Sequence, residues 1–290
     1  MNAATDRYMR LYRRRKLKDQ MMTALLRLCV VLALIPLVSI LSYVTWRGIG
    51  AVNLDFLMKT PAPVGASGGG MANSIVGSGI VVGLAALMGI PVGVLAGIYL
   101  AEYGRNNLFG KVVRFLADVL QGIPSIVVGI VAFTLVVLPM QTFSAFAGAV
   151  ALSMMLVPFV ARTAEEAILT VSDDIREAAM ALGQPRWRVI LSVILHAARG
   201  ALVTGAMLGI ARLAGETAPL LFTALNNRFW HQGLLAPIST LTVQVYTYAI
   251  APFDDWNAQA WAGAFVLLTL ILLTNVVART LARSKYGERS

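Results

Sequence analysis

An arginine and a glutamate stand inside a long apolar stretch of this sequence. Arg212 and Glu216 are four residues apart, so they would lie on one face of a continuous α-helix. Charge inside a membrane helix is costly and usually functional. A guanidinium stays charged when it is desolvated and can hold two oxygen atoms of an anion. The pair therefore indicates either a fixed cation for an anion, oriented by the glutamate, or a structural ion pair that never meets a substrate.

Small residues continue the same face of this expected helix. The spacing of 4, 3, 4 and 3 residues makes one stripe of Gly205, Gly209, Arg212, Glu216 and Pro219. An arginine that faced lipid would cost on the order of 3 kcal/mol, so we expect the stripe to face the interior of a bundle or a partner chain. Arg162 stands late in the preceding apolar stretch, and we expect it to reach the same cavity.

The whole chain has the composition of a membrane protein. Of its 290 residues, 58% are hydrophobic and only 13% are charged. Several apolar runs reach the roughly 20 residues that are needed to cross about 30 Å of hydrocarbon. We predict an all-α, polytopic membrane protein with about six transmembrane helices. The expected spans are 22–45, 73–100, 114–138, 145–165, 189–222 and 260–280.

Basic residues predict the orientation of these spans. Much of the net charge of +10 lies in two flanks, before the first apolar run and after the last. Such flanks are typical of the cytoplasmic side of a membrane, and this distribution argues against nucleic acid as a partner. Both termini are therefore expected in the cytoplasm. The chain divides into a basic N-terminal segment, a first helix with an external loop, a transmembrane core and a cytoplasmic tail, at 1–21, 22–72, 73–280 and 281–290.

Glycines and prolines predict where the backbone packs closely or breaks. Rows of small residues let helices approach in lipid, and two such rows are Gly79/Gly83 and Gly89/Gly93/Gly97. Proline interrupts helices, so we expect local kinks or unwinding at Pro91, Pro124, Pro158 and Pro219. The external loop 47–72 is rich in glycine and proline and is expected to be irregular. In the second external region, Thr240–Ile250 could form a partial helix in the interface or dipping into it.

A short amphipathic helix is expected before the fifth span. Asp174 can serve as its N-cap, with Glu177 closing a capping box, and Gly183 is a natural end. One apolar face would consist of Ile175, Ala178, Ala179 and Leu182. A helix this short is not stable alone in water. Its face must therefore pack on the membrane domain of the same chain or on a soluble partner, and the local sequence leaves both open.

The same segment resembles a known family motif. Glu177-Ala-Ala, Gly183 and Val193-Ile-Leu resemble the EAA loop of ABC importer permeases, although His196 stands where that family usually has proline. Four further segments resemble the A-type permeases of phosphate ABC importers: Gly97–Gly104, Pro124–Gly129, Gly68–Asn73 and Gly215–Ala224. This resemblance extends from about residue 47 to 280.

The resemblance implies a MetI-like fold and a non-catalytic subunit of an ATP-driven importer of inorganic phosphate in a bacterial inner membrane. A coupling helix at 173–187 would enter a groove of a dimeric nucleotide-binding ATPase. The residues expected to make this contact are Asp174, Ile175, Glu177, Ala178, Ala179, Leu182 and Gly183. Arg212, Glu216, Arg162 and Thr217 would line the substrate path. The remaining implied partners are a homologous C-type permease, which completes a heterodimer, and an extracytoplasmic phosphate-binding protein.

Other chemistry is not supported by the sequence. Gly104–Lys111 resembles a phosphate-binding loop but has five residues between its glycines instead of four, so we expect no ATP site on this chain. With two histidines, one cysteine and no metal-binding motif, neither a metal nor a cofactor is expected. Two alternatives remain: a permease for another oxyanion such as sulfate or molybdate, and an ATP-independent transporter or channel. The second alternative lacks paired inverted repeats.

Overall fold

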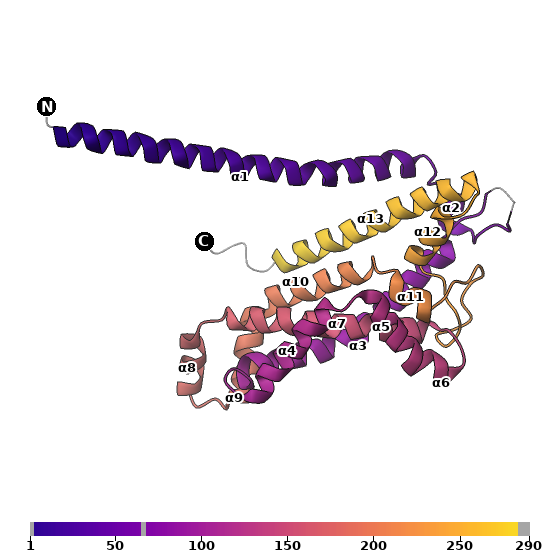
Figure 1. The fold of residues 1–290 in the computed structure, drawn as a ribbon. Helices are drawn as coiled ribbons and strands as arrows, with labels where there is room; N and C mark the ends of the chain where they lie inside the picture. Colours follow the sequence, from indigo (N-terminus) through magenta and orange to yellow (C-terminus); the bar gives the residue numbers. More distant parts are fainter. Residues whose placement is uncertain (1–2, 65–67, 284–290) are drawn as a thin grey trace. The chain divides into compact units, whose positions relative to one another are not determined.

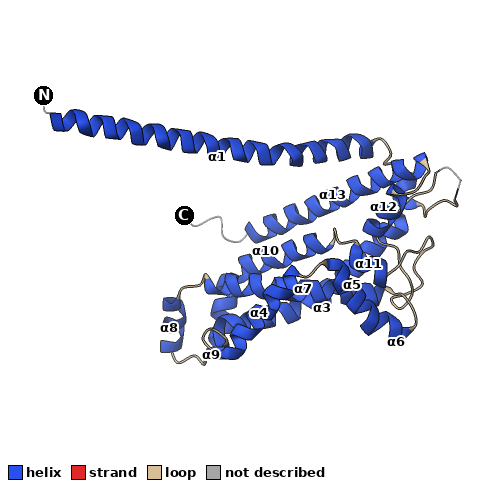
Figure 2. Ribbon diagram, viewed as in Figure 1, coloured by secondary structure: helices blue, strands red, loops and turns tan. Residues whose placement is uncertain are grey.

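The computed structural model describes residues 3–64 and 68–283. The chain divides into two compact units, Met1–Arg47 and Gly48–Ser290. Within the described ranges the regular elements are helices, accompanied by one isolated bridge between Pro61 and Gly69 (Figure 2). The predicted all-α fold is confirmed.

The first unit is essentially one long helix. α1 runs Ala3–Ile49, and at 1.5 Å per residue it is about 70 Å long, roughly twice the hydrocarbon thickness of a membrane. Its part Leu11–Ile49 is apolar enough to cross a membrane. The predicted first span, 22–45, is thus confirmed as part of a longer helix, which also takes in the basic segment from residue 3 onward.

The second unit is built around two long helices that lie side by side. α3 (Ala72–Ile98) continues into the π-helical segment η1 (Tyr99–Tyr103), and α7 (Ala145–Leu169) packs against it (Figure 1). Glycines of α3 make this contact close. A Cβ added at Gly97 would lie 2.6 Å from the Cβ of Ala164, which leaves no room for a side chain. The packing role predicted for the second glycine row is therefore confirmed, whereas a Cβ at Gly79 or Gly83 would meet nothing within 4 Å.

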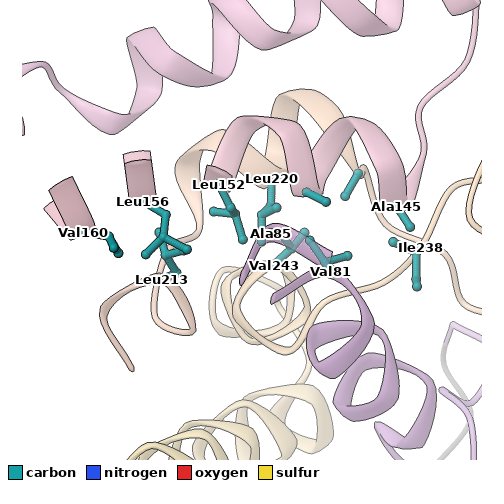
Figure 3. Packing of buried hydrophobic residues seen from close by; sticks show 12 residues of the cluster. Val81, Ala85, Ala145, Leu152, Leu156, Val160, Leu213, Leu220, Ile238 and Val243 are labelled. Atoms are coloured by element: carbon teal, nitrogen blue, oxygen red, sulfur yellow. The ribbon is translucent and has the colours of Figure 1, made fainter. Parts of the chain in front are cut away.

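Aliphatic side chains fill the core around α3 and α7 (Figure 3). Val81 and Ala85 of α3 meet Leu152 and Leu156 of α7, and Leu213 closes one side. These side chains are almost completely buried. The core also includes residues of α11 and α12, Leu220 and Val243.

The predicted span 114–138 is not one straight helix, because the chain bends there by 103°. α4 (Leu108–Gly122) is followed by α5 (Ser125–Ala132), and the bend lies at Ile123 and Pro124, in extended backbone. The second arm continues through η2 (Phe133–Val137) and α6 (Leu138–Met140). α4 begins beside the C-terminal part of α7, and the second arm of the bend leads to the N-terminus of α7. The chain therefore changes ends across the bend, as a broken span does, and Pro124 acts as the predicted breaking point.

The predicted fifth span, 189–222, is also not a single helix. α9 (Arg186–Val189), η3 (Ile190–Ile194) and α10 (Leu195–Leu213) form a continuous rod that ends at Leu213. A turn follows, and then α11 (Ala218–Thr223) begins. The physical reason lies in two residues. Gly215 is a poor helix former, and Pro219 has no N–H to donate to the carbonyl of Gly215.

The loop between α1 and α3 is more ordered than expected. It contains α2 (Leu54–Met58), whose Phe56 is buried beside Met71, Tyr248 and Trp256. Gly70 lies so close to the carbonyls of this turn that a Cβ would be 2.4 Å from the Asp55 oxygen. The prediction of a wholly irregular loop is therefore wrong.

The second external region holds the partial helix that was expected. α12 (Leu241–Ala249) is packed against the last helix, α13 (Asp254–Arg283), and several of its side chains are buried. The predicted span 260–280 falls inside α13. The predicted tail 281–290 lies outside the described residues from 284 on. The described chain thus has five candidate spans, or up to six if the bent pair counts as one.

The second unit has two ends that carry different elements (Figure 1). α8 (Asp173–Ala181) lies with α9 and η1 at one end, which we call the α8 end. α2 and α12 lie at the opposite end, called the α12 end.

Candidate functional site

The predicted coupling helix is present, with a different start. α8 begins at Asp173, its N-cap is Ser172, and no side chain caps it. The predicted capping box of Asp174 and Glu177 is therefore wrong, because Asp174 lies within the first turn. Gly183 has φ of +79°, the left-handed conformation that favours glycine after a helix. The predicted end of the helix is thus confirmed, and the expected segment 173–187 consists of α8 and the start of α9.

Most of the apolar face of α8 is not covered by this chain. Ile175 is 43% exposed and Leu182 84% exposed. Ala178 is exposed as well, and only Ala179 packs against a cluster of buried residues. Asp174 and Glu177, the two acidic residues predicted to contact the ATPase, are both exposed. The face is therefore available for a partner rather than consumed by the membrane domain.

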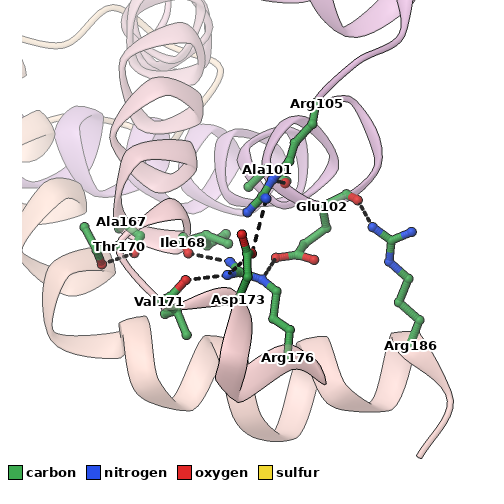
Figure 4. A network of polar contacts seen from close by, with 10 residues as sticks. All are labelled: Ala101, Glu102, Arg105, Ala167, Ile168, Thr170, Val171, Asp173, Arg176 and Arg186. Atoms are coloured by element: carbon green, nitrogen blue, oxygen red, sulfur yellow. Dashed lines mark hydrogen bonds and ion pairs between the residues drawn. The ribbon is translucent and has the colours of Figure 1, made fainter. Parts of the chain in front are cut away.

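Arg176 attaches α8 to the bundle (Figure 4). Its guanidinium donates to the Glu102 carboxylate at 3.0 Å, to the Ile168 carbonyl at 2.8 Å and to the Val171 carbonyl. Asp173 receives another bond at 3.0 Å. Neither Arg176 nor Glu102 was predicted from the sequence to be a functional residue. The available signal was Glu102 itself, a carboxylate at the end of an apolar span, where burial requires a cationic partner.

Arg162 does not stand free in a cavity. Its Nε lies 3.0 Å from Asp118 and its Nη1 lies 2.5 Å from Glu165. Glu165 is buried and also receives Arg114 at 2.5 Å. Two guanidiniums thus share two carboxylates, which leaves this group of four side chains with no net formal charge.

The predicted stripe through Arg212 and Glu216 is wrong beyond Leu213. Gly205 and Gly209 are buried against α7 as expected. Arg212 is exposed within this chain, with its guanidinium carbon 5.9 Å from the centre of the Phe159 ring. Because α10 ends one residue later, Glu216 lies in the following turn rather than one helical turn further on.

Arg212 and Glu216 form no ion pair within the described ranges, so the expected orienting contact is absent in this conformation. The Glu216 carbonyl accepts a bond of 3.0 Å from the Thr242 hydroxyl of α12. Thr217 is the N-cap residue of α11 and makes no side-chain cap bond. The broken helix therefore places three of the four predicted path residues at or beside a junction of α10, α11 and α12. Arg162 has other partners, on α4 and α7.

No metal-binding group of three or more His, Cys, Asp or Glu side chains occurs in residues 3–64 and 68–283. The arrangement provides a short helix with a largely uncovered apolar face at one end, and an exposed guanidinium beside a helix break within the bundle.

Comparisons with known proteins identify relatives of this chain. Residues 89–285 match the family model described as binding-protein-dependent transport system inner membrane component. The chain is 43% identical to the phosphate transport system permease protein PstA of Haemophilus influenzae, over 97% of this chain and 99% of that protein. It is 42% identical to the PstA of Yersinia pestis, over 93% and 92% of the two chains.

Solved structures give the same fold. An inward-facing structure of the MetNI methionine ABC transporter aligns with a TM-score of 0.59 at 20% identity, covering 73% of this chain and 92% of that one. A bacterial ABC transporter involved in alginate import aligns with a TM-score of 0.54 at 13% identity, covering 74% and 79%. The chain is a multi-span membrane protein, and it belongs to the PstA family of phosphate transport system permease proteins, within the binding-protein-dependent inner membrane components.

Proposed function

We propose that this chain is the permease subunit of an ATP-driven importer of inorganic phosphate. The observation that carries the proposal is the match to PstA proteins over nearly the full length of both chains. The break between α10 and α11 and the uncovered face of α8 fit a subunit that moves a solute and is driven by another chain. ATP hydrolysis then belongs to a partner.

The α8 end faces the cytoplasm in this proposal. The basic residues of the connections before α4 and around α8 lie at that end. We propose that both termini lie in the cytoplasm and that the chain resides in a bacterial inner membrane. A dimeric nucleotide-binding ATPase docks there on the exposed face of α8, through Ile175, Ala178 and Leu182. An extracytoplasmic phosphate-binding protein delivers substrate at the α12 end.

Arg212 is the cation that we propose to meet phosphate. It is exposed within this chain although it lies in an apolar rod, and an arginine left to lipid would be costly. A homologous C-type permease that packs on this face would enclose the guanidinium in a path between the two subunits. Glu216 and Thr217 lie at the break that follows and supply polar groups to the same path. Arg162 remains a candidate, but its two carboxylate partners compete with an anion.

Reconstitution tests the function. The chain is purified with the C-type permease and the ATPase subunit and placed in proteoliposomes with a phosphate-loaded or sulfate-loaded binding protein. We expect ATP hydrolysis and uptake of radiolabelled phosphate to rise with the first protein and not with the second. Stimulation by the sulfate-loaded protein would identify a permease for another oxyanion. Phosphate uptake without ATP would identify an ATP-independent transporter.

A further inference from the structure

Three arginines converge on the carboxyl end of the α3–η1 rod. In a π-helical turn, N–H groups bond to carbonyls five residues back, and the last carbonyls of any helix lack partners within it. Arg114 donates to the carbonyls of Leu100 at 2.8 Å and Gly104 at 3.1 Å. Arg105 donates to the Ala101 carbonyl at 2.8 Å, and Arg186 donates to that of Glu102. The negative end of the rod is thus tied to α4 and to α9.

A fourth arginine, Arg176, joins this end to α8 through a buried ion pair. The side chains of Arg176 and Glu102 are 9% and 4% exposed. The same guanidinium also donates to the carbonyl of Ile168, in the last turn of α7, and to that of Val171, just beyond the helix. One side chain therefore connects α8 with both central helices (Figure 4). Removing one partner of such a buried pair leaves the other charge uncompensated and strongly destabilises the fold.

One further ion pair fixes α8 to the bundle, between Asp173 and Arg105 at 3.3 Å, and both of its side chains are exposed. Its apolar residues Ile175, Met180 and Leu182 are exposed, and Ala179 is the α8 residue that packs against the buried cluster beneath it. A cavity of about 280 Å³ lies beside the ion pair, between Met180 of α8 and Ile190 and Ile194 of η3. Apolar packing therefore does not brace the helix on that side, and the polar link is its principal attachment.

We propose that the Glu102–Arg176 pair is the joint that transmits displacement of α8 to the α3–α7 pair. The inference rests on the proposed function, in which an ATPase moves α8. With the pair intact, α8 and the ends of η1 and α7 move as one body. With Glu102 neutralised, α8 still docks but shifts against the bundle, so ATP hydrolysis no longer drives transport. Glu102 is a positioning residue in this scheme and touches no substrate.

The test compares two carboxylates that bind the same guanidinium. Glu102→Gln removes the buried one and keeps the shape of the side chain. Asp173→Asn removes the other, whose side chain is 64% exposed and also binds the exposed Arg105 at 3.3 Å. In the reconstituted complex we expect Glu102→Gln to retain the ATPase subunit and lower phosphate uptake per ATP hydrolysed at least about tenfold. Asp173→Asn is expected to stay within about twofold of the wild type.

A second readout follows the joint itself. Cys29 is replaced by serine, and spin labels are placed at Ala181→Cys on α8 and Leu95→Cys on α3, both exposed positions. We expect one narrow distance distribution in the wild-type background and a broadened one with Glu102→Gln. If Glu102→Gln is not recovered folded, Glu102→Asp, which shortens the carboxylate arm, is measured in the same way, with a smaller broadening expected.

Three results would overturn the inference: unchanged uptake per ATP in Glu102→Gln, release of the ATPase subunit by that variant, or unchanged label distances. The first result would show that the pair does not transmit the movement of α8. The second would assign the pair to docking of the ATPase, and the third would show that the pair does not hold α8 rigidly to the bundle. Failure of the proposed function is distinguishable, because the wild-type complex then shows no phosphate-dependent ATP hydrolysis while the label distances still report on the joint.

Discussion

The Nε atom of Arg114 lies 2.5 Å from a carboxylate oxygen of Glu165, and the other oxygen of Glu165 receives Arg162 at the same distance. These residues join α4 to α7. The Glu165 side chain is only 3% exposed, so its charge is supported by the two guanidiniums and not by water. The first arm of the bent pair is thus held to the core by charge at the α8 end.

Neutralising Glu165 is therefore expected to destabilise the fold. Glu165→Gln leaves two partly buried guanidiniums without their shared counter-charge, and we expect a loss of about 3 kcal/mol in the free energy of unfolding. Asp118→Asn is the matched control, because it removes a partner of Arg162 whose side chain is 57% exposed and is expected to cost no more than about 1 kcal/mol. Thermal unfolding in detergent measures both. Equal effects would show that burial of Glu165 does not matter.

The contact between α3 and α7 is expected to tolerate no added methyl group at Gly97. Gly97→Ala would place a Cβ 2.7 Å from the carbonyl oxygen of Ala161 as well as against Ala164, and overpacking of this kind costs about 1–3 kcal/mol. Gly83→Ala, on the same helix, meets nothing within 4 Å and is expected to be neutral or to stabilise by up to about 1 kcal/mol. The melting temperatures of the two purified variants are compared. If Gly97→Ala melts no lower than Gly83→Ala, the close approach is not a constraint.

Hydropathy and glycine spacing were enough to predict the helical fold, the positions of most spans and the α3 side of the α3–α7 contact. Hydropathy did not show that two apolar runs are broken, although kinks or unwinding were expected at Pro124 and Pro219. Residues 189–222 contain a helix, a turn and a second helix. Hydropathy averaged along this run does not separate the three parts. Gly215 and Pro219 mark the turn, but glycine and proline also occur inside intact membrane helices, as Pro91 does in α3. Only tertiary contacts separate the two cases.

The site shows the same limit. Gly183 ends α8 through its own backbone conformation, which is a local property and was predictable. The start of α8 was not, because Ser172, Asp173 and Asp174 are adjacent candidates for the N-cap. The attachment of α8 depends on Arg176 and Glu102, which are 74 positions apart, and no local pattern records such a pairing.

Replacing Arg212 by lysine is expected to impair transport without disturbing assembly. Lysine keeps the charge but loses the planar fork that binds two oxygens of an anion, and the loss of a charge-assisted bond of about 1.5–3 kcal/mol corresponds to at least a tenfold fall in uptake. Arg228→Lys is the control, because Arg228 lies over the Trp256 ring, 5.2 Å from its centre, and has no role in the proposed path. Uptake of radiolabelled phosphate by the reconstituted complex is measured.

Assembly of the Arg212 variants is checked by the amount of ATPase subunit that co-purifies, which we expect to be unchanged. Arg212→Ala is expected to lower uptake further, because no cation remains at that position. Normal uptake in a fully assembled Arg212→Ala complex would remove Arg212 from the substrate path.

Charge placed on the apolar face of α8 is expected to release the ATPase. Leu182→Asp puts a carboxylate where an 84% exposed leucine would be desolvated on docking, and a buried charge without a partner is strongly unfavourable. Glu177→Lys reverses a charge on the same helix and is expected to weaken the contact. Phe229→Asp is the control, since Phe229 is 77% exposed but lies in the loop before α12. Co-purification of the ATPase subunit is measured for all three. Full retention by Leu182→Asp, together with unchanged phosphate uptake, would mean that α8 does not form the docking surface, and the uncovered face of the helix would then need another partner.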